Sequence, residues 1–157
     1  MEFSFLDWRR SEVVFVAVVL AVILAVSMFQ LRVGEMKTRD AQRKADVELV
    51  SRALERYFGD YGEYPREHEG KIKFCGDKGL AACEWGEGKM VDVDNVVYLQ
   101  RVPQDPLASE GWRYVYETDG GGFKIYVGLE YGRDKDAKSG LTRECGNGVE
   151  CKWYVEK

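Results

Sequence analysis

The first strong pattern along the chain is an apolar run from Val13 to Leu31, in which Ser27 and Gln30 are the only polar residues. The run contains no proline or glycine and has the length of a membrane-spanning segment. Because hydrocarbon offers the backbone no hydrogen-bond partners, a span of this kind has to be helical. The pattern therefore predicts an N-terminal membrane helix.

After the run, apolar residues recur at steps of three and four, which is typical of a helix with one apolar face. Gly59, Gly62 and Pro65 then act as helix breakers. We therefore expect one helix from Glu12 to about Phe58, in which the span continues into an amphipathic stalk. The charged residues between the apolar ones predict a solvated opposite face: Lys37, Arg39, Asp40, Arg43, Lys44, Asp46, Glu48, Arg52, Glu55 and Arg56.

The clearest strands come later, at Trp112 to Glu117 and Phe123 to Glu130, which are rich in aromatic and β-branched residues. The glycine-rich residues 118–122 between them predict a hairpin. A last strand is expected at Lys152 to Val155. The fold class is then α+β, with the long N-terminal helix packed against a small antiparallel sheet of three or four strands. Residues 66–89 are polar and glycine-rich and predict a loop region, with a helical turn near Leu80 to Cys83.

Length and charge limit what this arrangement can be. Of the 157 residues, the anchor and stalk leave roughly a hundred for one globular head. The expected domains are residues 1–31, with the membrane helix, and residues 32–157, with the amphipathic half of the long helix. A cleaved signal is disfavoured because the run is too long and the helical pattern continues from its end. The net charge of −4 gives no broad basic field, so no nucleic-acid partner is expected.

The four cysteines, Cys75, Cys83, Cys145 and Cys151, all follow the apolar run. An even number in a small domain suits disulfides in an oxidising compartment. Of the three pairings, we favour Cys75 with Cys83 and Cys145 with Cys151, because each pair brackets glycine-rich sequence. A four-thiolate zinc site is the alternative, although its ligands usually lie two to four residues apart. Disulfides would place the head outside the cytoplasm and the N-terminus inside, as a single-pass membrane protein.

Catalytic chemistry is not indicated. The only histidine, His68, lies between two glutamates and is read as a solvated loop residue. No serine has a nucleophile-elbow context, and no phosphate loop or dinucleotide fingerprint is present. We therefore expect that the protein is not an enzyme.

Four segments, taken in order after the membrane helix, carry a resemblance: Arg39 to Asp46, Ala53 to Tyr57, Asp60 to Pro65, and Tyr98 to Pro106. The first three resemble the stalk and following turn of the type IV pilin and pseudopilin superfamily. The fourth contains Val102-Pro103-Gln104-Asp105-Pro106 and is similar to an element of the major pseudopilin, the main shaft subunit of type II secretion systems. The resemblance implies a pilin-like fold.

On that pattern, Glu12 falls at the position of a family glutamate that pairs with the amino terminus of a neighbouring subunit and sets the stagger of a filament. The alternative is that Glu12 lies in the lipid headgroup layer. Trp8 would be the first mature residue, but Asp7 stands where the peptidase expects glycine. Arg9 and Arg10 replace small or apolar residues of the family. We therefore expect an uncleaved or atypically processed subunit.

The resemblance also implies a metal. Major pseudopilins carry a calcium site in a loop comparable to the one after the main strand here, which makes Asp134 and Asp136 candidate ligands. Solvated carboxylates are the alternative that the neighbouring Lys135 and Lys138 favour. No other cofactor is expected.

The expected function is a filament subunit, most like the major pseudopilin of a type II protein secretion system, polymerising through its N-terminal helix. Its expected partners are further copies in a helical filament, other pilin-like subunits, an inner-membrane assembly platform and the lipid bilayer, from which it would be extracted into a periplasmic or extracellular filament. One alternative is a type IV pilin for adhesion, motility or DNA uptake. Another is a non-polymerising single-span protein with an extracytoplasmic binding domain.

Overall fold

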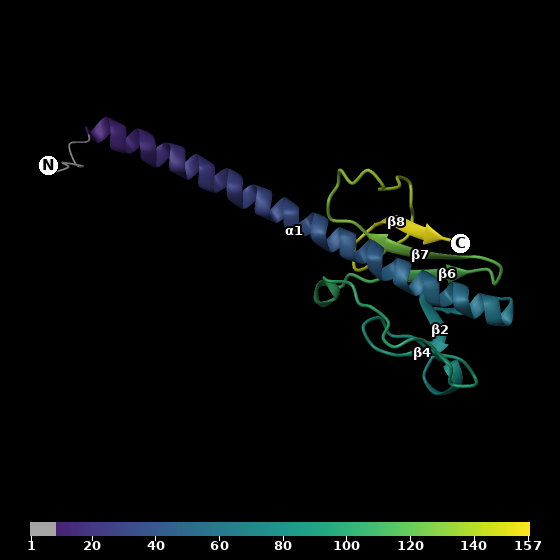
Figure 1. Ribbon diagram of the computed structural model, residues 1–157. Helices are drawn as coiled ribbons and strands as arrows, with labels where there is room; N and C mark the ends of the chain where they lie inside the picture. Colours follow the sequence, from purple (N-terminus) through teal and green to yellow (C-terminus); the bar gives the residue numbers. More distant parts are fainter. Residues whose placement is uncertain (1–8) are drawn as a thin grey trace. The chain divides into compact units, whose positions relative to one another are not determined.

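The computed structural model describes residues 9–157. Its longest element is α1 (Arg10–Tyr61), an uninterrupted helix of 52 residues (Figure 1). Gly62 ends the helix with a φ of 76°, and its N–H donates to the carbonyl oxygen of Phe58 at 2.7 Å. The predicted single helix is therefore observed, although Gly59 lies inside it and does not break it.

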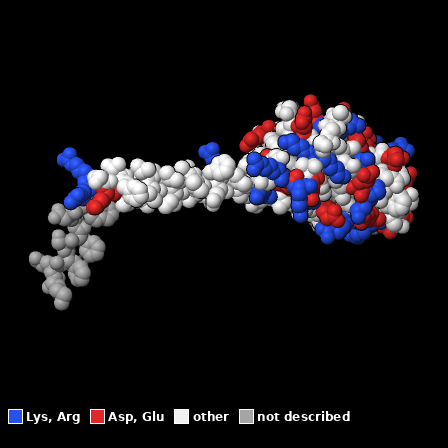
Figure 2. All heavy atoms as spheres, turned by 90° about the horizontal axis from the view of Figure 1, so that it is seen from above, with Lys and Arg blue, Asp and Glu red and all other residues white. Residues whose placement is uncertain are grey.

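Two compact units divide the chain, residues 1–36 and residues 37–157. The boundary expected from the sequence lies between residues 31 and 32, five residues earlier. In the first unit, the described side chains of residues 9–32 are all exposed. Figure 2 shows this stretch of helix almost free of charged side chains beyond its first turn. The second unit holds the rest of α1, every strand and the hydrophobic core.

The main sheet of the second unit has three antiparallel strands in the order β6-β7-β8. They are β6 (Val115–Thr118), β7 (Phe123–Gly128) and β8 (Cys151–Glu156). Thr118 pairs with Phe123, which closes the predicted hairpin. The first strand begins later than predicted, because Trp112 forms an isolated bridge with Gly146 instead of joining β6.

A second sheet is made of short strands: β1 (Glu67–His68), β2 (Lys71–Cys75), β3 (Ala81–Ala82), β4 (Met90–Val91) and β5 (Val97–Leu99). Its order is β1-β2-β4-β5, with β3 also paired to β2. The prediction of a helical turn near Leu80 to Cys83 is wrong, because Ala81 and Ala82 form strand β3. The N–H of Cys83 donates to the carbonyl oxygen of Ile72 at 2.7 Å and holds this segment beside β2. The 3₁₀ helices are η1 (Asp77–Gly79) and η2 (Ala108–Glu110).

The amphipathic half of α1 forms the centre of the second unit. Its side chains Val47, Val50, Ala53 and Leu54 are buried together with aromatic and aliphatic residues of both sheets. Figure 1 shows the three-stranded sheet alongside this half of the helix. The buried residues contributed by the sheets and their connections include Ile72, Phe74, Met90, Tyr98, Tyr114, Tyr116, Phe123, Ile125, Val127 and Leu129. The expected α+β class is therefore observed.

Both favoured disulfides are formed. Cys75 and Cys83 are joined with a Cα–Cα distance of 5.0 Å, and so are Cys145 and Cys151. The first disulfide joins the end of β2 to the residue after β3, and the second joins the start of β8 to the preceding loop. With every cysteine in a disulfide, a four-thiolate zinc site is ruled out.

Candidate functional site

The exposed apolar part of α1 is the first candidate surface. Within the described residues, this helix is long and apolar enough to cross a membrane, and no side chain of its apolar stretch is buried. Such a surface has to be covered by lipid or by protein. Ala17, Ala21 and Ala25 follow one another at four-residue steps, so they share one side of the helix. Small residues at this spacing let neighbouring helices approach closely in a membrane, and the sequence analysis overlooked this signal.

Glu12 lies in the first turn of α1 and has a partner within its own chain. Its Oε2 accepts a hydrogen bond from the backbone N–H of Arg9 at 3.3 Å. A glutamate that reaches back in this way from the third helical position forms half of a capping box. Its negative charge also interacts favourably with the positive end of the helix dipole. Asp7 and Trp8, on either side of the expected cleavage point, lie outside the described residues.

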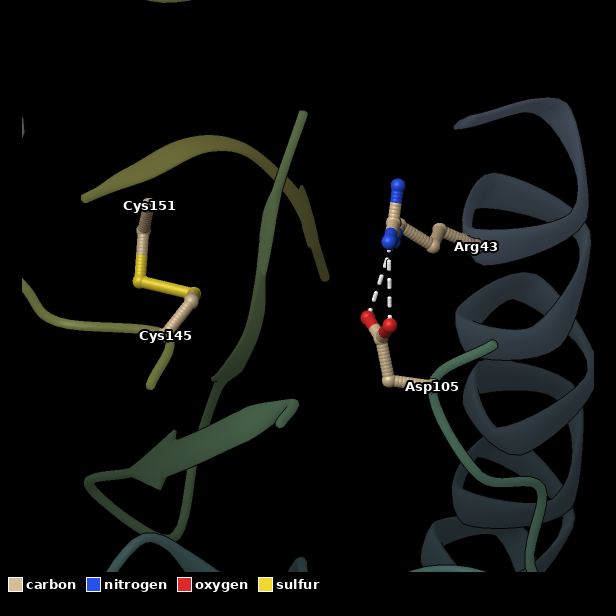
Figure 3. The surroundings of a disulfide bond; sticks show 4 residues. All are labelled: Arg43, Asp105, Cys145 and Cys151. Carbon is tan, nitrogen blue, oxygen red and sulfur yellow. Dashed lines mark hydrogen bonds and ion pairs between the residues drawn. A yellow bond between two sulfur atoms is a disulfide. The ribbon is translucent and has the colours of Figure 1, made fainter. Parts of the chain in front are cut away.

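The second candidate site is a cluster of ionised side chains around Arg43. Its guanidinium binds Asp105 through two hydrogen bonds, from Nε at 2.9 Å and from Nη2 at 3.0 Å (Figure 3). Nη1 donates to both Asp40 and Glu130 at 2.7 Å. The guanidinium carbon also lies 4.3 Å from the ring centroid of Trp112. The cluster thus joins α1 to three segments that are distant in the sequence.

This cluster corrects the sequence analysis, which placed Asp40 and Arg43 on a solvated helix face. Their exposed fractions are 1% and 0%. Burial acts to lower the pKa of Arg43, but its hydrogen bonds to Asp105, Glu130 and Asp40 outweigh that effect and hold the pKa above its usual value. The two charges are tolerated inside the domain because each is paired and hydrogen-bonded.

Asp105 belongs to the sequence element that carries the pseudopilin resemblance. Its Oδ1 accepts a hydrogen bond from the backbone N–H of Leu107 at 2.8 Å, which fixes the carboxylate in a local turn. Pro103 precedes this turn and Pro106 lies within it, and both restrict its backbone. Figure 3 shows the carboxylate facing the guanidinium of Arg43. The element therefore has a physical role here, which is to aim a buried carboxylate at the helix.

Glu130 lies in the segment after β7 and is bound by two arginines of α1. It accepts hydrogen bonds from Arg39 at 2.8 and 2.6 Å and one from Arg43. The hydrogen bonds from Arg39, followed by those from Arg43, lower the pKa of Glu130 in spite of its partial burial. The backbone N–H groups of Glu130 and Tyr131 donate to the two carboxylate oxygens of Asp40 at 3.0 and 2.8 Å.

The candidate calcium ligands Asp134 and Asp136 are brought together by a lysine. Nζ of Lys44 lies 2.8 and 2.9 Å from the two oxygens of Asp134 and 2.8 Å from Oδ2 of Asp136. Across residues 9–157, no three His, Cys, Asp or Glu side chains are grouped so that they could hold a metal ion. Calcium needs six to eight oxygen ligands, so this arrangement does not fit the ion.

The remaining predictions concern catalysis. His68 is exposed in the short strand β1, away from the buried core. The expectation that the protein is not an enzyme stays a prediction.

No family model, curated protein or solved structure matched the chain. Its own geometry defines an α+β protein in which one helix supplies both an exposed apolar segment and the centre of a disulfide-bonded domain.

Proposed function

We propose that the protein is a subunit of a pilin-like filament, most similar to the major pseudopilin of type II secretion systems. The observation that supports this best is the continuity of α1, which is exposed and apolar at one end and forms the core of a globular domain at the other. A subunit of this kind can rest in a bilayer before assembly. It can then exchange lipid contacts for contacts with other copies.

In this proposal, the apolar segments pack side by side and the globular domains coat the assembly. Packing between apolar helices depends on close approach, which the alanines at positions 17, 21 and 25 allow. Other pilin-like subunits and a membrane platform that adds subunits are further proposed partners. The disulfides support an extracytoplasmic globular domain, with the N-terminus on the cytoplasmic side.

Glu12 would give the assembly its register. A carboxylate that leaves water for a bundle of apolar helices needs a positive partner, because an unpaired charge there is costly. If the chain is processed, the partner is the amino terminus of a neighbouring copy. If it is not, Arg9 or Arg10 of a neighbour carries the same charge at the same end of the helix.

Electron microscopy of cells that overproduce the protein tests the proposal. We expect filaments from the wild type and none from Glu12→Gln. Glutamine keeps an oxygen that can cap the helix but removes the charge, so this variant separates capping from pairing between subunits. Glu35→Gln, the same change at an exposed position further along α1, is the matched control and should form filaments.

The absence of filaments from the wild type when the assembly machinery is present would overturn the proposal. It would favour the rival class, a single-span protein whose extracytoplasmic domain binds a ligand without polymerising. If Glu12→Gln forms filaments, the proposal of a filament subunit stands, but the proposed role of the Glu12 charge is wrong. An intact mass equal to that of a chain beginning at Trp8 would show that the subunit is cleaved and would overturn the expectation of an uncleaved chain.

A further inference from the structure

The segment after the main strand, residues 130–136, contains the acidic residues Glu130, Asp134 and Asp136 and little regular structure. Four basic residues of α1 contact this segment: Lys37, Arg39, Arg43 and Lys44. Arg39 and Arg43 bind the start of the segment, as described above. Nζ of Lys37 lies 4.6 Å from the ring centroid of Tyr131.

Lys44 holds the far end of the segment. Its ammonium group has three donors, and the three oxygens within 2.9 Å come from both aspartates. The backbone N–H of Asp136 also donates to Oδ1 of Asp134 at 2.9 Å, so the two aspartates form one turn around the ammonium. Burial acts to lower the pKa of Lys44, but hydrogen bonds to Asp134 and Asp136 outweigh it and raise the pKa. The hydrogen bond from Lys44 is also the main cause of the lowered pKa of Asp134.

We propose that the Lys44 ammonium is a built-in cation that orders residues 131–141, so that this loop needs no calcium. A metal ion placed between these aspartates would be repelled by the positive charge of Lys44. A calcium ion at a distance from Lys44 would lose the two carboxylates that the lysine holds. The inference rests on contacts inside the second unit, so it does not depend on filament formation.

The neighbouring contacts support a loop that is ordered from within the chain. The N–H of Ala137 donates to the carbonyl oxygen of Asp134 at 3.1 Å. The N–H of Lys138 donates to the carbonyl oxygen of Lys152 in β8 at 2.6 Å. The Lys138 ammonium lies 3.3 Å from the ring centroid of Tyr154. The contacts of Lys138 hold the loop to β8, and those of Lys44 hold it to α1.

Amide hydrogen exchange of the full chain in detergent micelles tests the proposal. In Lys44→Met, exchange in residues 131–141 should rise by about tenfold, because the loop loses the ammonium that holds both of its aspartates to α1. Lys135→Met makes the same change at an exposed position on the same loop and should leave exchange unchanged. Lys44→Arg keeps the charge and should restore most of the protection.

A second measurement compares wild-type melting temperatures in calcium chloride and in a calcium chelator. We expect equal values. A melting temperature that falls in the chelator would overturn the proposal, and so would Lys44→Met with wild-type exchange in the loop. If Lys44→Met does not fold, Asp134→Asn weakens the same contact from the loop side and should give the same local increase in exchange.

Discussion

At the scale of single residues, the least expected feature is the buried ion cluster around Arg43. On the helix, Arg43 continues the three- and four-residue spacing of the buried Val47, Val50 and Leu54, and only its charge suggested a solvated position like that of the exposed Arg52 and Arg56. The spacing does not reveal which residue pairs with this charge. The partner is Asp105, which lies 62 residues away. A contact over that separation leaves no trace in local spacing, whereas the disulfide pairs lie close in the sequence and could be predicted.

Replacing Arg43 should be strongly destabilising. Arg43→Met leaves Asp105 buried without its partner, which costs about 3–5 kcal/mol when one member of a buried pair is removed. Urea unfolding in micelles, followed by tryptophan fluorescence, measures the change, since Trp112 packs on the guanidinium. Arg52→Met, at an exposed position on the same helix, is the control and should change the free energy of unfolding little.

The double variant Arg43→Met with Asp105→Asn tests the cause. Asparagine removes the orphaned negative charge, so the double variant should be more stable than Arg43→Met alone. Equal or lower stability of the double variant would contradict the view that the unpaired carboxylate is what makes the single variant unstable.

Glu130 makes stability depend on acid. Its pKa in the folded protein is lowered from the usual 4.5, mainly by Arg39 and then by Arg43. A lowered pKa stabilises the fold above the unfolded value and loses that contribution as the pH falls through the folded value. The free energy of unfolding of the wild type should therefore decrease below about pH 4.5. Glu130→Gln should be less stable at neutral pH and show a shallower decrease, and parallel curves for the two proteins would contradict this assignment.

At the scale of elements, sequence analysis succeeded where a pattern extends over several residues. The long helix follows a clear periodicity, and the strands β6 and β7 are rich in aromatic and β-branched residues. In β7, Phe123, Ile125 and Val127 face the core as alternation requires. Strands β1, β3, β4 and β5 have only two or three residues each. Such short strands have no period to detect, and their pairing depends on turns and on the first disulfide.

The two disulfides should stabilise different elements. Their sequence separations of 8 and 6 correspond to about 2 kcal/mol each from restriction of the unfolded chain. We expect Cys75→Ser with Cys83→Ser to speed hydrogen exchange in β2 and β3. Cys145→Ser with Cys151→Ser should do so at the start of β8. Urea unfolding of each double variant gives the free energy, and exchange that spreads evenly over both sheets would contradict this separation.

At the scale of the whole molecule, the chain combines two units with different requirements. The apolar segment of the first unit needs lipid or other apolar helices around it, whereas the second unit has its own core and a surface that mixes both charges (Figure 2). The helix α1 belongs to both units. In the filament that we propose, each copy would bring a folded domain together with an apolar segment that packs against those of other copies.

The most direct test of that assembly is amine cross-linking of the wild type in membranes of cells that contain the assembly machinery, followed by separation by mass. The exposed lysines of the second unit provide reactive groups, for example Lys73, Lys89 and Lys135. A polymer should give a ladder of many bands spaced by the chain mass of 18.0 kDa. A single band, or a dimer and nothing larger, would contradict the proposal that the protein forms a filament.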